Sequence, residues 1–226
     1  MLPSTSPPTV KEILKIARRT TDIIRDHITP NVCLFGSAAS YLWADIGRDP
    51  NDIDIVLWDE YGFSDPEDVK QIIVAADDRY YLEPSRKLGA THEILYCRLP
   101  GWRTNGRCVK VDILVPGTLG LPEINWDDQV WIANVPVMPL FALLVMKTKG
   151  WWDHRISSRS DFRAKEGADL TDIDALLDRA FEEEVSYQVE KYRYTSEFTR
   201  RGITLARKFV RIYGQPGKWR RLGFPL

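Results

Sequence analysis

Two neighbouring stretches decide the fold, NVCLFGS at residues 31–37 and DIDIVLW at residues 52–58. The first is a short apolar run that ends in Gly36 and Ser37, and residues 38–43 after it favour a helix. The second alternates apolar and polar residues, which is typical of a strand. We therefore expect a strand, a glycine turn into a helix, and a second strand.

The rest of the chain predicts further strands and then helices. Residues 92–99 (HEILYCRL) and 108–115 (CVKVDILV) are strand-like, and the turn-rich residues 100–106 between them indicate an antiparallel pair. Helices are expected at residues 10–28, where Thr9 and Glu12 form a capping-box pattern, at 65–76, from Pro139 through Lys147, at 171–180 and at 196–213. After a loop at residues 116–129, the chain is expected to be helical to its end.

These elements predict an α+β fold class, with a small mixed β-sheet lobe and flanking helices, followed by an α-helical lobe. The expected division is an N-terminal helix at residues 1–28, a sheet-containing lobe at 29–135 and a helical lobe at 136–226. The helical lobe carries a basic C-terminal segment.

The composition is that of a globular protein. Hydrophobic residues make up 44% of the 226 residues and charged residues 28%, which excludes disordered, collagen-like and coiled-coil classes. The three cysteines (Cys33, Cys97 and Cys108) have no CxxC spacing, which favours a reduced, intracellular setting. Residues 1–10 lack a signal-peptide pattern, and the longest uncharged run, 129–146, contains two prolines. We therefore expect a cytoplasmic protein without membrane contact.

The net charge of −1 conceals a strongly basic C-terminal segment. Residues 191–226 hold ten Lys or Arg and one acid, Glu197, which leaves 31 − 10 = 21 basic and 32 − 1 = 31 acidic residues in residues 1–190. Aromatic residues are interleaved with these cations, so single-stranded or structured RNA is one expected partner of residues 191–221. A solvated helical face is the alternative. The ten cations are Lys191, Arg193, Arg200, Arg201, Arg207, Lys208, Arg211, Lys218, Arg220 and Arg221.

Three acids in strand-like stretches are the candidate metal ligands. Asp52 and Asp54 are two residues apart, so a strand places them on one face, and Asp112 interrupts the apolar run of residues 111–115. Neighbouring carboxylates repel each other unless a cation compensates them, and Mg²⁺ prefers such oxygen ligands. Two alternatives remain: an exposed edge strand whose acids face water, or a salt bridge from Asp112 to Lys110 or Arg98.

Gly36 and Ser37 are the candidate phosphate-binding residues. They stand where a strand passes into a helix, and free backbone N–H groups at such a junction can hold an anion such as a triphosphate. An ordinary turn is the alternative. The chain contains no GxxxxGK[ST], GxGxxG or HExxH pattern and no zinc-type spacing of Cys and His.

The ordered elements Phe35-Gly36-Ser37, Asp52-Ile53-Asp54 and Val111-Asp112-Ile113 resemble the signature of the DNA polymerase β-like nucleotidyltransferases. Residues 144–149 and 169–177 are similar to the lysine and acid motifs of AbiEii-type and aminoglycoside-modifying members. The resemblance implies two Mg²⁺ ions, replaceable by Mn²⁺, with Asp52 and Asp54 on both and Asp112 on the catalytic one. It also implies Gly36 and Ser37 on the β- and γ-phosphates.

The same resemblance implies that Lys147 and Lys149 bind the nucleotide. From the residues alone, Lys147 ends a buried helical stripe, so its charge needs a partner, which can equally be Asp172. The expected function is Mg²⁺-dependent transfer of an NMP from an NTP, ATP among the candidates, to a hydroxyl of a small molecule, protein or RNA. A catalytically silent nucleotide-binding or scaffold module on the same fold is the alternative, and an unrelated metal-dependent hydrolase is a third.

Overall fold

The computed structural model describes residues 6–58, 65–86, 89–101, 103 and 106–226. Contacts within the chain divide it into two compact units. Unit 1 comprises Met1–Ala39, Asp49–Leu119 and Ile124–Met138, and unit 2 comprises Ser40–Arg48, Gly120–Glu123 and Pro139–Leu226. Each is described here by itself.

Unit 1 is built on a mixed sheet of seven strands in the order β3-β4-β5-β2-β1-β7-β6. The strand pairs β2 with β5 and β1 with β7 are parallel, and the other neighbours are antiparallel. The predicted α+β fold class, with a mixed sheet, is therefore confirmed. The strands are β1 (Val32–Phe35), β2 (Ile53–Leu57), β3 (Tyr80–Pro84), β4 (Glu93–Arg98), β5 (Cys108–Leu114), β6 (Val130–Ile132) and β7 (Val135–Val137).

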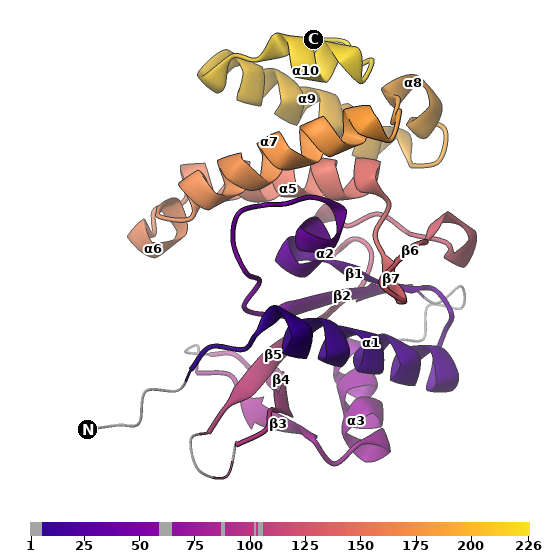
Figure 1. The fold of residues 1–226 in the computed structure, drawn as a ribbon, viewed down its shortest axis with the longest axis vertical. Coiled ribbons are helices and arrows are strands. Elements are labelled where there is room, and N and C mark those ends of the chain that lie inside the picture. The colour runs from indigo at the N-terminus through magenta and orange to yellow at the C-terminus, as the bar shows by residue number, and fades with distance from the viewer. Residues whose placement is uncertain (1–5, 59–64, 87–88, 102, 104–105) are drawn as a thin grey trace. The chain divides into compact units, whose positions relative to one another are not determined.

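Two helices, α1 (Val10–His27) and α3 (Pro66–Ala76), pack against each other and against the strands of this sheet (Figure 1). The predicted capping box is present, because the Thr9 side chain accepts from the Glu12 N–H and the Glu12 carboxylate accepts from the Thr9 N–H. Asp65 caps α3 in a similar way. The apolar stripe of α1 is fully buried at Ile13, Ala17 and Ile24.

The sheet is larger than the sequence predicts, and the expectation of helix from residue 130 onward is wrong for residues 130–137. These residues form the hairpin β6–β7, in which Trp131 lies opposite Pro136. Proline lacks the N–H that a strand ladder uses, so this three-residue strand has no recognisable strand pattern. Strand β3 was also not predicted. The pairing of β4 with β5 is antiparallel as expected, although residues 102, 104 and 105 of the predicted turn lie outside the described residues.

Unit 2 is helical, and its central helix is α5 (Leu140–Ile156). The other helices are α6 (Ser160–Arg163), α7 (Glu166–Glu182), α8 (Tyr187–Glu190), α9 (Ser196–Tyr213) and α10 (Pro216–Arg221). Helix α5 packs against α6, α7 and α9, and residues 140–146 of α5 are buried. The helix expected at 196–213 has those bounds, and it ends at Gly214, whose φ of 79° suits glycine. The helices expected at 139–147 and 171–180 are real but longer.

Large aromatic side chains, Trp151 and Phe209 among them, form part of the core of unit 2. Trp151 has no exposed surface, and its ring lies 5.2 Å from that of Phe209. Phe198 and Trp219 are buried as well. No helix in the described part of the chain is both long and apolar enough to span a membrane.

Candidate active site

The passage from β1 to helix α2 (Gly36–Trp43) brings the backbone of Gly36 against a carboxylate. Gly36 has a φ of 70°, and a Cβ added there would lie 2.0 Å from Asp54 Oδ2. Phe35, the residue before it, is the register partner of Asp54 in the antiparallel pair of β1 with β2. Two features therefore require glycine at position 36: its left-handed backbone conformation and the close approach of the Asp54 carboxylate.

The acids predicted as metal ligands meet in the middle of the sheet. Asp54 in β2 is the register partner of Asp112 in the parallel neighbour β5. Asp52 precedes Asp54 by two residues, and the Ser37 hydroxyl donates to Asp52 Oδ1 at 3.5 Å. We refer to Asp52, Asp54 and Asp112 as the acid triad.

The exposed-edge alternative for Asp52 and Asp54 is wrong. Strand β2 lies between β1 and β5, and the residues that flank Asp54 (Ile53 and Ile55) have no exposed surface. The acid triad itself is half-buried. Carboxylates at such positions need a partner, because a partly desolvated charge is costly when it is not compensated.

Lys110 supplies a positive charge beside the triad. Its ammonium donates to Asp112 Oδ2 at 2.5 Å, so one of the two salt bridges that the sequence allows for Asp112 is present. Arg98, the other partner considered, instead donates to the backbone oxygen of Asp78. Partial burial by itself lowers the pKa of Lys110, but the hydrogen bond to Asp112 and the charges of Asp112, Asp52 and Asp54 together raise it above its ordinary value.

A cavity of about 710 Å³ in unit 1 is lined by Asp54, Asp112 and Lys110. Its volume is in the range of small-molecule sites, which is about 300–1,000 Å³. Arg86 and His92 also line this cavity. Neither was predicted as a site residue, because nothing in the local sequence around Arg86 or His92 indicates that these side chains line the same cavity as Asp112.

The chemistry of the acid triad suits Mg²⁺, since three carboxylates offer the hard oxygen ligands that this ion prefers. Their side chains are engaged elsewhere: Asp112 accepts from Lys110, and Asp52 accepts from Ser37. Among the residues that the structure describes, no three His, Cys, Asp or Glu side chains form a group arranged to ligate a metal. The acid triad matches the ion in residue type and in the strand register of Asp54 with Asp112, but the side chains are not gathered around a common point, and Lys110 holds one oxygen of Asp112.

Lys147 and Lys149 lie in unit 2, where each contacts a carboxylate. Lys147 donates to Asp172 Oδ2 at 2.6 Å, and Arg48 donates to both oxygens of the same carboxylate, at 3.1 and 2.6 Å. Asp172 has no exposed surface. Lys149 forms an ion pair with Asp153. The structural role considered for Lys147 is thus present, and a nucleotide-binding role for either lysine stays a prediction.

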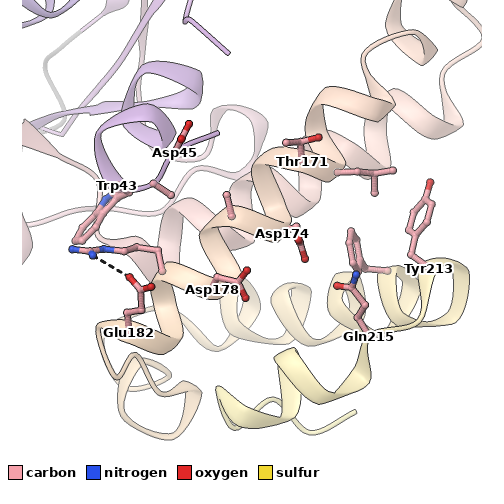
Figure 2. Close-up of a pocket in the computed structure, with 13 residues that line it drawn as sticks. Trp43, Asp45, Thr171, Asp174, Asp178, Glu182, Tyr213 and Gln215 are labelled. Atoms are coloured by element: carbon pink, nitrogen blue, oxygen red, sulfur yellow. Dashed lines mark hydrogen bonds and ion pairs between the residues drawn. The ribbon is translucent and has the colours of Figure 1, made fainter. Parts of the chain in front are cut away.

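Unit 2 has a second cavity, of about 800 Å³, with acids along one wall (Figure 2). Asp174, Asp178 and Glu182 of α7 line it, together with Trp43 and Tyr213. These acids have cationic partners, since Lys218 contacts both Asp174 and Asp178, and Arg179 donates to Glu182 at 3.2 Å. The negative charge of these acids is therefore compensated by cations of unit 2.

The basic C-terminal segment keeps cations at its surface. Arg200, Arg207 and Arg211 share an exposed face of α9 at helical spacing. Several of the aromatic residues in this segment are not available to contact RNA, because Phe198, Phe209 and Trp219 belong to the core. Tyr192, in contrast, is 81% exposed. RNA as a partner stays a prediction.

One comparison with known proteins finds a similar fold. No protein-family model matches the chain, and no curated protein matches it. A solved structure, that of an antigenic nucleotidyltransferase-like protein from Paracoccidioides brasiliensis, is similar over 97% of this chain and 95% of its own, with a TM-score of 0.63 and 16% sequence identity. The chain therefore has the fold of a nucleotidyltransferase-like protein.

The substitution Gly36→Ala should both strain the backbone and push the Asp54 carboxylate away. A left-handed backbone costs a non-glycine residue about 1–2 kcal/mol, and the clash adds to this cost. We expect a lower free energy of unfolding in urea. The matched control is Gly117→Ala, because Gly117 has a φ of 85° and nothing within 4 Å of an added Cβ. Equal losses in the two variants would contradict the role assigned to Gly36.

Proposed function

We propose that this protein is a divalent-metal-dependent nucleotidyltransferase that moves an NMP from an NTP to an acceptor hydroxyl and releases pyrophosphate. The observation that carries the proposal is the register of β2 with β5, which sets Asp54 opposite Asp112 beside the turn at Gly36. The nucleotidyltransferase-like fold supports it.

The reaction exchanges one phosphorus–oxygen bond for another. The acceptor oxygen forms a bond to the α-phosphorus, the bond from that phosphorus to the bridging oxygen of the β-phosphate breaks, and pyrophosphate leaves with the electron pair. In this proposal Asp112 would accept the proton of the acceptor hydroxyl. The Gly36 N–H and the Ser37 hydroxyl, at the start of α2, would hold the β- and γ-phosphates.

Asp52, Asp54 and Asp112 are the residues that would hold Mg²⁺. When bound there, Mg²⁺ would supply positive charge to the transferring phosphate. The contribution of the chain is to keep Asp54 and Asp112 at fixed places on two central strands, with Asp52 directly before the first of them. Lys147 and Lys149 remain proposed nucleotide contacts, and an RNA acceptor would use the exposed arginines of α9.

A silent nucleotide-binding module is the second candidate, and the contact of Lys110 with Asp112 favours it. Three like charges side by side argue for a metal, but an ammonium at 2.5 Å compensates part of that charge without one. The two candidates therefore differ in turnover, not in architecture.

The deciding experiment incubates the protein with each NTP labelled at the α-phosphate, with Mg²⁺ or Mn²⁺, and with three separate acceptor pools. The pools are total RNA, a mixture of small amines and alcohols, and protein extract. We expect pyrophosphate release and label transfer in one pool. NTP binding in calorimetry without pyrophosphate from any pool would support the silent module, and release of NDP and phosphate would support a hydrolase.

A further inference from the structure

Lys110 is built into the acid triad by the geometry of β5. Side chains alternate along a strand, so Lys110 and Asp112, two residues apart, lie on the same face of the sheet. The Lys110 ammonium lies 2.5 Å from Asp112 Oδ2, and the two side chains are 39% and 33% exposed. Both residues line the same cavity as Asp54.

A second carboxylate lies beside this contact. Asp54 is the register partner of Asp112 on the neighbouring strand β2, and it lines the same cavity as Lys110. Lys110 is therefore bound to one acid of the triad while another acid lines the same space, which differs from an isolated pair of one lysine and one acid.

We propose that the Lys110 ammonium and a divalent cation compete for the Asp112 carboxylate, so that Lys110 sets how tightly the acid triad binds metal. The inference rests on the proposed function, because it concerns the metal ligands of that same site. For a cation to use Asp112 Oδ2, Lys110 must release it. The apparent affinity of the triad for metal is therefore lowered by two costs, that of breaking this contact and that of holding two cations close together.

The test measures the Kd for Mn²⁺ of the full chain, in wild type and in Lys110→Met. Mn²⁺ is titrated into each protein, and the concentration of the free ion is monitored by electron paramagnetic resonance. Removal of a unit positive charge a few ångströms from a dication should lower the Kd about tenfold or more, since such charges repel measurably even in water. Lys110→Arg keeps the charge and should stay within about threefold of wild type. Thermal melting in EDTA should show Lys110→Met as less stable, with recovery on addition of Mn²⁺.

Lys218→Met is the matched control. Lys218 also holds an ammonium against two carboxylates, Asp174 and Asp178, but it belongs to unit 2. Its removal should leave the Kd for Mn²⁺ unchanged. An equal Kd in wild type and Lys110→Met would overturn the inference and leave the proposed function standing, whereas absence of Mn²⁺ binding in both proteins would overturn the two together.

A second measurement needs no variant and so is independent of whether Lys110→Met folds. Amine-selective labelling of the wild-type protein, read by mass spectrometry, compares the reactivity of Lys110 with and without Mn²⁺. Release from Asp112 should raise the labelling rate of Lys110 severalfold and leave that of Lys218 unchanged. An unchanged Lys110 rate at saturating Mn²⁺ would overturn the competition.

Discussion

The substitution Asp54→Asn is expected to lower the rate of NMP transfer about a thousandfold while the fold persists. Asp54 is central to the acid triad, because it pairs in register with Asp112 and lies against Gly36. Metal ions contribute several kcal/mol to such transition states, and each 1.36 kcal/mol corresponds to a factor of about ten in rate. Asparagine keeps the shape of the side chain but removes the charge that binds the cation.

The measurement is the initial rate of pyrophosphate release with the acceptor pool that supports wild-type turnover. Asp26→Asn is the control, because Asp26 is an exposed residue of α1 outside the cavity. Circular dichroism should show both variants folded. Wild-type turnover in folded Asp54→Asn would remove the acid triad from the mechanism.

The largest expected loss of stability follows Asp172→Ala. Asp172 has no exposed surface and is the shared partner of Lys147 and Arg48. The substitution leaves two cations facing each other without their carboxylate, and breaking a buried pair in this way costs about 3–5 kcal/mol. For a chain of this size, this corresponds to a fall in Tm of about 10 °C.

Asp153→Ala is the matched control for that loss. Asp153 also pairs with a lysine of α5, Lys149, but its side chain is 48% exposed. Exposed ion pairs contribute about 1 kcal/mol or less. Urea denaturation should therefore show a clearly larger loss of unfolding free energy in Asp172→Ala than in Asp153→Ala. If the loss in Asp172→Ala is no greater than that in Asp153→Ala, the contacts of Asp172 with Lys147 and Arg48 do not stabilise unit 2.

The parts of the fold that could be predicted are those with a strong local pattern. The alternation of residues 52–58 predicts β2 because Ile53 and Ile55 must be buried, and the spacing of α1 predicts its buried stripe. Strand β7 could not be predicted, since it has only three residues and contains Pro136. Its place beside β1 depends on tertiary pairing, which no short segment specifies.

The candidate site was predictable in its residue types but not in its contacts. An acid within an apolar strand predicts that Asp112 has a partner, but the sequence alone does not distinguish Lys110 from Arg98 as that partner. The pairing of Lys147 with Asp172 could be predicted, because Lys147 ends a buried helical stripe and its charge needs a partner. Arg48, which completes that network, lies 124 residues from Asp172 along the chain, and no local pattern connects them.

The two outer strands of the sheet limit association between molecules. An exposed strand edge offers unpaired N–H and C=O groups to which a strand of another chain can add, and this is a route to aggregation. Strand β6, at one edge, has only three residues, and the guanidinium of Arg25 lies 4.8 Å from the ring of its Trp131. Strand β3, at the other edge, ends at Pro84, which has no N–H to donate. Each edge therefore offers a short template, so that growth of the sheet from one molecule into the next is disfavoured.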